Sequence, residues 1–244
     1  MLLPDPLHLK HTILKTSVLS SAFQLQGNRP RQEDYVFYDS TDTFIIADGM
    51  GGMDHGDIAG KLAVESATWA IHLAKQRISY WKDKKLLGGR VFRSVNWTLY
   101  NKRRESGFES GLGSTLTILL FGEKQFYLYS VGDSPAYLYR DKKIRLLTPL
   151  DRDPRGYLTK AIGISKNAPP EFFFTDKIEG NDLFLLSSDG VADHLSETKM
   201  EEILLKAGDS KEEIDEAVKN VVISAEKQGS KDNMTACIIK CIVY

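Results

Sequence analysis

The order of the expected elements places this chain in the α+β class, with two stacked antiparallel β-sheets and a pair of helices on each outer face. Three observations predict this αββα sandwich. Apolar runs of strand length come in two groups, each group is followed by two stretches of helical periodicity, and a last apolar run closes the chain. A doubly wound parallel sheet would alternate strand and helix more regularly, so the order favours antiparallel sheets with helices outside them.

The first half of the chain contains three expected strands and then two expected helices. The strands fall within 12–26, at 35–39 and in the apolar run 44–48, and the helices cover about 56–77 and 83–105. The second helix is expected despite Gly88-Gly89. We also expect the three tryptophans, Trp69, Trp81 and Trp97, to pack into the core.

The second half repeats this plan with more strands. Short strands are expected at 114–122, 125–132, 135–140, 143–148, 171–176 and 182–188, helices at 197–206 and 211–227, and a final strand at 234–243. Asp141-Lys142 is suited to a hairpin turn. Ser210 and Glu213 form a capping box ahead of the last helix.

The composition is that of a globular protein, and we expect residues 1–244 to form a single domain. Hydrophobic residues make up 42% of the chain, while 32 Lys and Arg balance 33 Asp and Glu, so there is no basic field for nucleic acid. No apolar stretch approaches the roughly 18–20 residues of a membrane span. The N-terminal residues 1–15 lack the apolar segment of a signal peptide.

The two cysteines favour a reducing compartment. Cys237 and Cys241 lie four residues apart in an expected strand, which separates them by about 13 Å, too far for a disulfide within that strand. We therefore expect two buried thiols and a cytoplasmic location.

Three apolar runs each lead into an aspartate at a turn. The pairs are Asp48-Gly49, Gly132-Asp133 and Asp189-Gly190. An aspartate at the end of a buried strand holds its carboxylate at the rim of the core. Several converging carboxylates repel one another unless something positive neutralises them, and a hard divalent cation bound by oxygens does so.

Two further acidic signals extend this set. Glu33-Asp34 opens the second strand, and Asp232-Asn233 opens the last one. Because adjacent strand residues point to opposite faces, Glu33 and Asp34 cannot reach one metal in the same way, and one of them is expected to act through water. All the candidate ligands are oxygens, which favours Mg²⁺ or Mn²⁺. Each piece alone also fits an ordinary turn or a solvated surface; the ordered set favours a metal site. The candidate carboxylates are Glu33, Asp34, Asp48, Asp133, Asp189 and Asp232.

Seven motifs, taken in order, resemble the metal-dependent serine/threonine protein phosphatases of type 2C. They are Arg29-Pro30-Arg31-Gln32-Glu33-Asp34, Asp48-Gly49-Met50-Gly51-Gly52, Gly113-Ser114-Thr115, Val131-Gly132-Asp133-Ser134, Leu158-Thr159-Lys160-Ala161-Ile162-Gly163, Ser188-Asp189-Gly190 and Lys231-Asp232-Asn233-Met234-Thr235. They span about residues 22–243, and the Asp-Gly-Met-Gly-Gly form resembles the bacterial branch. The resemblance implies the family's β-sandwich with helices on both flanks.

The resemblance also implies roles for the acidic residues. Asp48 would bridge two metal ions, and Gly49 would contribute its carbonyl oxygen to them. Glu33 would hold one ion through water, and Asp34 would support these ligands. The two ions would be Mn²⁺ or Mg²⁺.

The remaining implied roles lie in the second half of the chain and in one arginine. Asp189 and Asp232 would hold the other ion, and Asp133 with Asp189 would form a weaker third ion site. Arg29 would bind the substrate phosphate, since a guanidinium offers two parallel donors to two phosphate oxygens. Asp48 and Arg29 are thus the expected catalytic residues.

The implied reaction is hydrolysis of phosphoserine and phosphothreonine in proteins. A hydroxide that bridges the two ions would attack phosphorus, and no phosphoenzyme would form. The expected partners are phosphorylated proteins, including a serine/threonine kinase or its targets, in cytoplasmic signalling. We expect a monomer that binds neither nucleic acid nor membrane.

Two departures from the family pattern concern the surroundings of the site. Met50 stands where eukaryotic members carry a histidine proposed as general acid, and the nearby His55 is expected at the surface. Only residues 149–157 stand where bacterial members insert a longer flap, so the flap is shortened. Two alternatives remain open: a phosphatase-like binding or regulatory module with little turnover, and a hydrolase of small phosphoesters.

Overall fold

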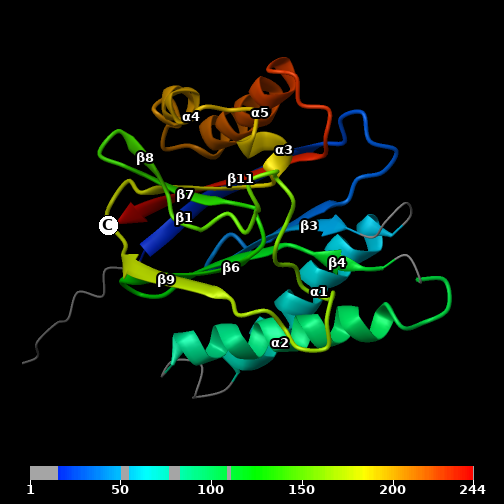
Figure 1. Cartoon of the computed structure of the whole chain (residues 1–244). Coiled ribbons are helices and arrows are strands. Elements are labelled where there is room, and N and C mark those ends of the chain that lie inside the picture. Colours follow the sequence, from blue (N-terminus) through cyan, green and yellow to red (C-terminus); the bar gives the residue numbers. More distant parts are fainter. Residues whose placement is uncertain (1–15, 51–54, 77–82, 109–110, 244) are drawn as a thin grey trace, which may run out of the picture.

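Two antiparallel sheets stack face to face, and helices cover both outer faces (Figure 1). This computed structural model describes residues 16–50, 55–76, 83–108 and 111–243. The architecture confirms the predicted α+β class and the αββα layering.

The two sheets draw their strands from both halves of the chain. The first sheet runs in the order β1 (Thr16–Leu25), β11 (Met234–Val243), β10 (Leu183–Ser187), β7 (Ala136–Arg140) and β8 (Lys143–Leu146). The second runs β2 (Asp34–Tyr38), β3 (Thr43–Met50), β5 (Leu116–Phe121), β6 (Gln125–Val131) and β9 (Phe172–Lys177), with β4 (Gly113–Ser114) beside β3.

The helices are divided between the outer faces. In Figure 1, α1 (Gly56–Lys75) and α2 (Lys84–Lys102) lie below the second sheet, and α4 (Glu197–Leu204) and α5 (Lys211–Lys227) lie above the first. A short helix, α3 (Asp189–Ala192), follows β10 directly. Throughout the described residues, each helix is too short or too polar to cross a lipid bilayer.

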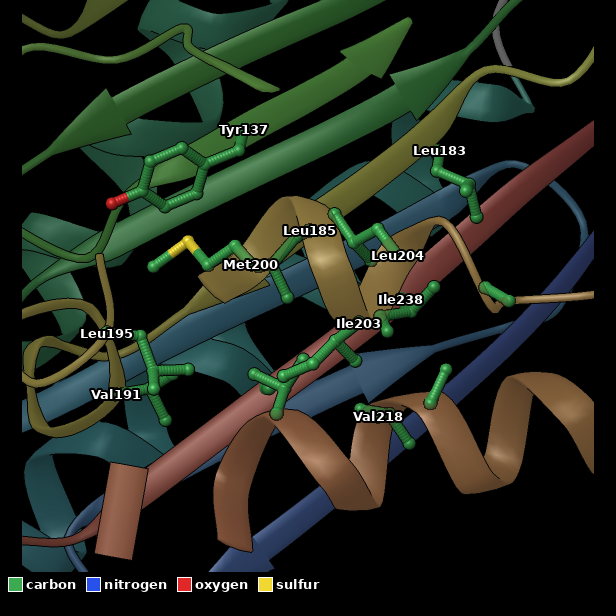
Figure 2. Close-up of a cluster of buried hydrophobic side chains, with 14 of the residues drawn as sticks. Tyr137, Leu183, Leu185, Val191, Leu195, Met200, Ile203, Leu204, Val218 and Ile238 are labelled. Atoms are coloured by element: carbon green, nitrogen blue, oxygen red, sulfur yellow. The ribbon is translucent and has the colours of Figure 1, made fainter. Parts of the chain in front are cut away.

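Alternation along the strands separates three apolar layers. In β3, Phe44 and Ile46 enter the layer between the sheets, while Ile45 packs against α1 and α2. In β10, Leu185 instead faces the helices of the first sheet. Figure 2 shows this third layer, where side chains of α4 and α5 such as Met200 meet those of the sheet. Buried layers on both faces explain why these strands have almost continuous apolar sequences.

Local signals predict most element boundaries well. The last strand occupies the predicted 234–243, and the capping box of Ser210 and Glu213 is present. Asp141 and Lys142 both have positive φ, as a tight hairpin turn between β7 and β8 requires. Helix α3 has no counterpart among the predicted elements, because four residues are too few to show a helical period.

The prediction that the tryptophans pack into the core is wrong for the two that the structure describes. The side chains of Trp69 and Trp97 are 63% and 56% exposed, and Trp81 lies outside the described residues. Trp97 is two positions from the buried Val95 and Leu99, which places it on the opposite side of α2. Trp69 has the same relation to its buried neighbours in α1.

The antiparallel pairing gathers the predicted site at one end of the sandwich. The end of one strand lies beside the start of the next, so Asp34 at the start of β2 pairs with Asp48 near the end of β3. In the other sheet, the end of β10 at Ser187 lies opposite Ala236 near the start of β11. Segments that are about 200 residues apart in sequence therefore meet at this end.

Candidate metal centre

A pocket of about 330 Å³ opens at this end of the sandwich. It contains seven of the eight predicted site residues: Arg29, Glu33, Asp48, Gly49, Asp133, Asp189 and Asp232. The eighth, Asp34, is buried behind the pocket wall and does not line it. Met50, Thr115 and Asn233 also line it, together with Gly156 and Tyr157 of the segment predicted to be a short flap and with the following Leu158.

Asp48 is held by its backbone at the centre of the pocket wall. Its N–H donates to the hydroxyl of Thr115 at 2.8 Å, and its carbonyl oxygen accepts from the N–H of Thr115 and from the hydroxyl of Ser114. The carboxylate is thus free to face the pocket. Burial and the neighbouring charge of Asp34 raise the pKa of Asp48 well above its usual value.

Glu33 and Asp34 differ in their surroundings, although they are adjacent in sequence. Glu33 lines the pocket, and burial moderately raises its pKa. Asp34 is 1% exposed, and burial raises its pKa to about 7. Among the described residues neither oxygen of Asp34 has a hydrogen bond of ordinary geometry, although the hydroxyls of Ser188 and Thr235 lie close enough to moderate the rise.

Glycines allow the first turn of α1 to approach the end of β3 closely. A Cβ atom on Gly49 would lie 1.9 Å from the carbonyl oxygen of Gly56, and one on Gly56 would lie 2.4 Å from the carboxylate of Glu33. Neither position can accept a side chain without moving this helix. The close contact leaves the backbone of Gly49 in the pocket wall beside Asp48.

Asp232 and Arg29 form the outer side of the pocket. A guanidinium nitrogen of Arg29 lies 2.5 Å from a carboxylate oxygen of Asp232, and this hydrogen bond raises the pKa of Arg29. About half of the Arg29 side chain is exposed, so the guanidinium stays accessible from solvent.

Asn233 fixes the loop that carries Arg29 and Glu33. Its side-chain amide donates to the carbonyl oxygens of Gln26 and Arg31, and its amide oxygen accepts from the N–H of Glu33 at 2.8 Å. The loop preceding β2 is thereby joined to the loop preceding β11.

Asp189 opens helix α3, and this helix packs closely on the start of β11. A Cβ on Gly190 would lie only 2.0 Å from the carbonyl oxygen of Asn233. Burial, with the charges of Asp133 and Asp232, raises the pKa of Asp189 to about 6. Asp133, two residues beyond β6, accepts a hydrogen bond from Nε of Arg152 at 2.6 Å.

The donor set fits divalent cations that prefer oxygen ligands. Burial is the main cause that raises the pKa values of Asp34, Asp48 and Asp189, and the charges of neighbouring carboxylates raise them further, so a bound cation would stabilise the ionised forms. Within the described residues, no three acidic, His or Cys side chains already converge as a complete metal cluster. The carboxylates surround the pocket, which leaves room for the water ligands that Mg²⁺ and Mn²⁺ retain.

The sequence alone does not reveal the hydrogen bonds that three polar residues, Thr115, Asn233 and Arg152, make in this site. Thr115 and Asn233 stood inside quoted motifs, but neither their hydrogen bonds nor those of Arg152 have a local signature. His55, expected at the surface, is half-buried against the ring of Phe108 and is not among the residues that line the pocket.

Fold and site together define a class of protein. The profile of the protein phosphatase 2C family matches residues 23–234, and the chain belongs to this family.

Relatives with known names support the assignment over most of the chain. The serine/threonine phosphatase stp of Listeria monocytogenes serotype 4b is 26% identical over 226 residues, which cover 83% of this chain and 85% of the relative. The protein phosphatase PhpP of Streptococcus pneumoniae is 23% identical, with 93% and 97% covered. The crystal structure of the catalytic domain of the serine/threonine protein phosphatase PstP, in complex with two manganese ions, superposes with a TM-score of 0.80 at 25% identity. That comparison covers 93% of this chain and 99% of the PstP domain.

Proposed function

We propose that this protein hydrolyses phosphoserine and phosphothreonine in proteins with the help of two divalent ions, Mn²⁺ or Mg²⁺. The observation that carries the proposal is the convergence of Asp48, Asp189 and Asp232 on one pocket with Arg29 at its rim. Membership of the protein phosphatase 2C family supports it, as do the names of the relatives. The two manganese ions of the PstP domain support the choice of metal.

The carboxylates and one backbone carbonyl are assigned to the ions. Asp48 would be the ligand shared by both ions, Gly49 would add its carbonyl oxygen, and Glu33 would act through water, all from the side of the pocket where β2 begins and β3 ends. Asp189 and Asp232 act from the other side. Two bound dications supply an activated water at neutral pH and oppose the charge of the phosphoryl oxygens.

Asp34 has a supporting role in this proposal. Asp34 is buried and pairs with Asp48 in the β2–β3 register, so the two side chains lie on the same face of the sheet. A negative charge at this position strengthens the attraction of the site for cations and orients the ligands in front of it.

Arg29 is proposed to bind the substrate phosphate. It lies at the exposed edge of the pocket and already pairs with a carboxylate oxygen of Asp232. A phosphoryl group offers the same kind of acceptor, and the guanidinium can donate to two of its oxygens. Asp232 would then be released towards a metal ion.

We also propose partners, an oligomeric state and a cellular location for this protein. We propose phosphorylated proteins as partners, including a serine/threonine kinase or its targets, and a monomer that acts in cytoplasmic signalling. The two buried free thiols, Cys237 and Cys241, suit a reducing compartment.

The experiment is hydrolysis of a phosphothreonine peptide with and without Mn²⁺. Wild-type protein should release phosphate only with the metal, and Asp189→Asn should reduce the rate by roughly 100-fold or more because a charged ligand is lost. Asp215→Asn, on the exposed side of α5, is the matched control and should retain the wild-type rate. Full activity in excess chelator would contradict the proposal.

Two alternatives predict different results in the same assay. A binding module would take up Mn²⁺ without turning over any phosphopeptide. A small-phosphoester hydrolase would prefer nucleotides or simple esters over phosphopeptides. Arg29 is half-exposed at the edge of the pocket, so a phosphate carried by a protein can reach it, as the proposal requires.

A further inference from the structure

Arg152 lies among three carboxylates on one side of the candidate metal centre. Its Nε is 2.6 Å from Asp133, its Nη1 is 2.8 Å from both carboxylate oxygens of Asp193, and its Nη2 is 3.6 Å from Asp189. Only 17% of its side chain is exposed. This arginine is therefore an internal cation of the site and differs from the exposed arginines of the surface.

The backbone around Arg152 holds the guanidinium in this position. The preceding Asp151 exchanges hydrogen bonds with Gly132, because its N–H donates to the glycine carbonyl and its carboxylate accepts from the glycine N–H. Lys160 adds an ion pair to Asp151 at 2.7 Å. Arg152 itself pairs with Leu158 across the turn of the short segment 149–157.

The space between Asp133 and Asp189 is the place where the sequence resemblance implies a weaker third ion. In the structure that space is occupied by a guanidinium, which carries a permanent positive charge. A dication bound there would have to displace the hydrogen bond to Asp133 and would repel Arg152 at short range. The residues present do not fit a third metal ion.

We propose that Arg152 replaces the third dication in this protein, so that the centre binds two ions only. Arg152 neutralises Asp133 through the hydrogen bond to its carboxylate, and its Nη2, 3.6 Å away, offsets part of the charge of Asp189. It acts as a positioning residue, and the compensation does not depend on the ambient metal concentration. This inference rests on the proposed function, because it deepens the assignment of the same site.

The test is the number of Mn²⁺ ions bound, measured by calorimetric titration and by electron paramagnetic resonance of the free ion. We expect two ions for wild-type protein and still two for Asp133→Asn. Arg152→Gln should bind a third ion, because it frees Asp133 and Asp189 as ligands, and the double variant Arg152→Gln/Asp133→Asn should return to two.

Arg140→Gln is the matched control for Arg152→Gln. Arg140 is also largely buried and pairs with two carboxylates, Asp182 and Glu179, but it lies at the far end of β7, outside the residues that line the pocket. It should bind two ions like the wild-type protein. A third ion in both variants would mean that the gain is not specific to Arg152, and it would contradict the proposal.

The wild-type and Asp133→Asn proteins decide the question even if Arg152→Gln does not fold. Three ions in the wild-type protein, with one lost in Asp133→Asn, would overturn the inference while leaving a metal-dependent phosphatase intact. No uptake of Mn²⁺ by the wild-type protein would overturn both this inference and the proposed function. An Arg152→Gln protein that folds and binds only two ions would also contradict the replacement.

Discussion

Among the residues of the site, Asp34 shows most clearly that the site lowers the stability of the folded protein. It is a fully buried carboxylate with no hydrogen bond of ordinary geometry among the described residues, and burial raises its pKa from 3.8 to about 7. An ionised group in that position is costly unless a positive charge compensates it. A cation bound by the neighbouring Asp48, as proposed above, would supply that charge.

Because its pKa is raised, Asp34 makes the stability of the folded protein fall as the pH rises. The folded protein retains a proton that the unfolded chain loses near pH 4, so this contribution to stability is present below about pH 4 and is lost as the pH rises to about 7. In chelator, Asp34→Asn should therefore be more stable relative to wild type at pH 8 than at pH 5. Urea unfolding at the two pH values measures the difference.

The control for Asp34→Asn is a buried aspartate that already has a cation. Asp182 is equally buried and is paired with Arg140 at 2.7 Å. Asp182→Asn should destabilise the protein at both pH values, because it leaves a buried arginine without its partner. If Asp34→Asn gave the same change at pH 5 and pH 8, the assignment of a raised pKa to Asp34 would be wrong.

At the scale of elements, α2 depends on a glycine that helix propensity alone would disfavour. A Cβ on Gly88 would lie 2.3 Å from the ring of Tyr129 in β6, whereas one on Gly89 would meet only the ends of Glu171 and Arg93 at 3.2 Å or more. The hydroxyl of Tyr129 donates to the carbonyl of Lys84 at 2.6 Å. Gly88 is thus the contact point between α2 and the second sheet.

Neighbouring substitutions in α2 should have opposite effects. Gly88→Ala should destabilise the protein by about 1–3 kcal/mol, because the methyl group forces the helix away from Tyr129. Gly89→Ala should be neutral or stabilise by up to about 1 kcal/mol through helix propensity. Both values come from urea unfolding with metal held constant, and equal effects at the two positions would contradict this packing.

Local sequence patterns predict the helices and strands of this fold, but not the contacts between its loops. Strands and long helices follow from local periodicity, so β11 and α5 were predicted at their observed bounds. The acidic residues were found because strand ends are local features. The role of Arg152 and the three hydrogen bonds of Asn233 depend on the paths of loops that meet only in the folded chain, and they have no local signal.

In the whole molecule, the sandwich brings many acidic side chains together at one end, although the net charge of the chain is only −1. Ends of five different strands contribute to it, and the hydrogen-bonded loops around Asn233 and Arg152 close it on two sides. The rest of the fold, with its three apolar layers, holds these ends together against their mutual repulsion. We infer that bound dications neutralise the repulsion that remains between these carboxylates.

The anomalous signal of manganese in a crystal grown with Mn²⁺ would show whether dications bind in this pocket. We expect two peaks inside the pocket, with oxygens of Asp48, Asp189 and Asp232 as protein ligands. A map with no peak in this pocket, or with manganese only at sites away from Asp48, would contradict the account.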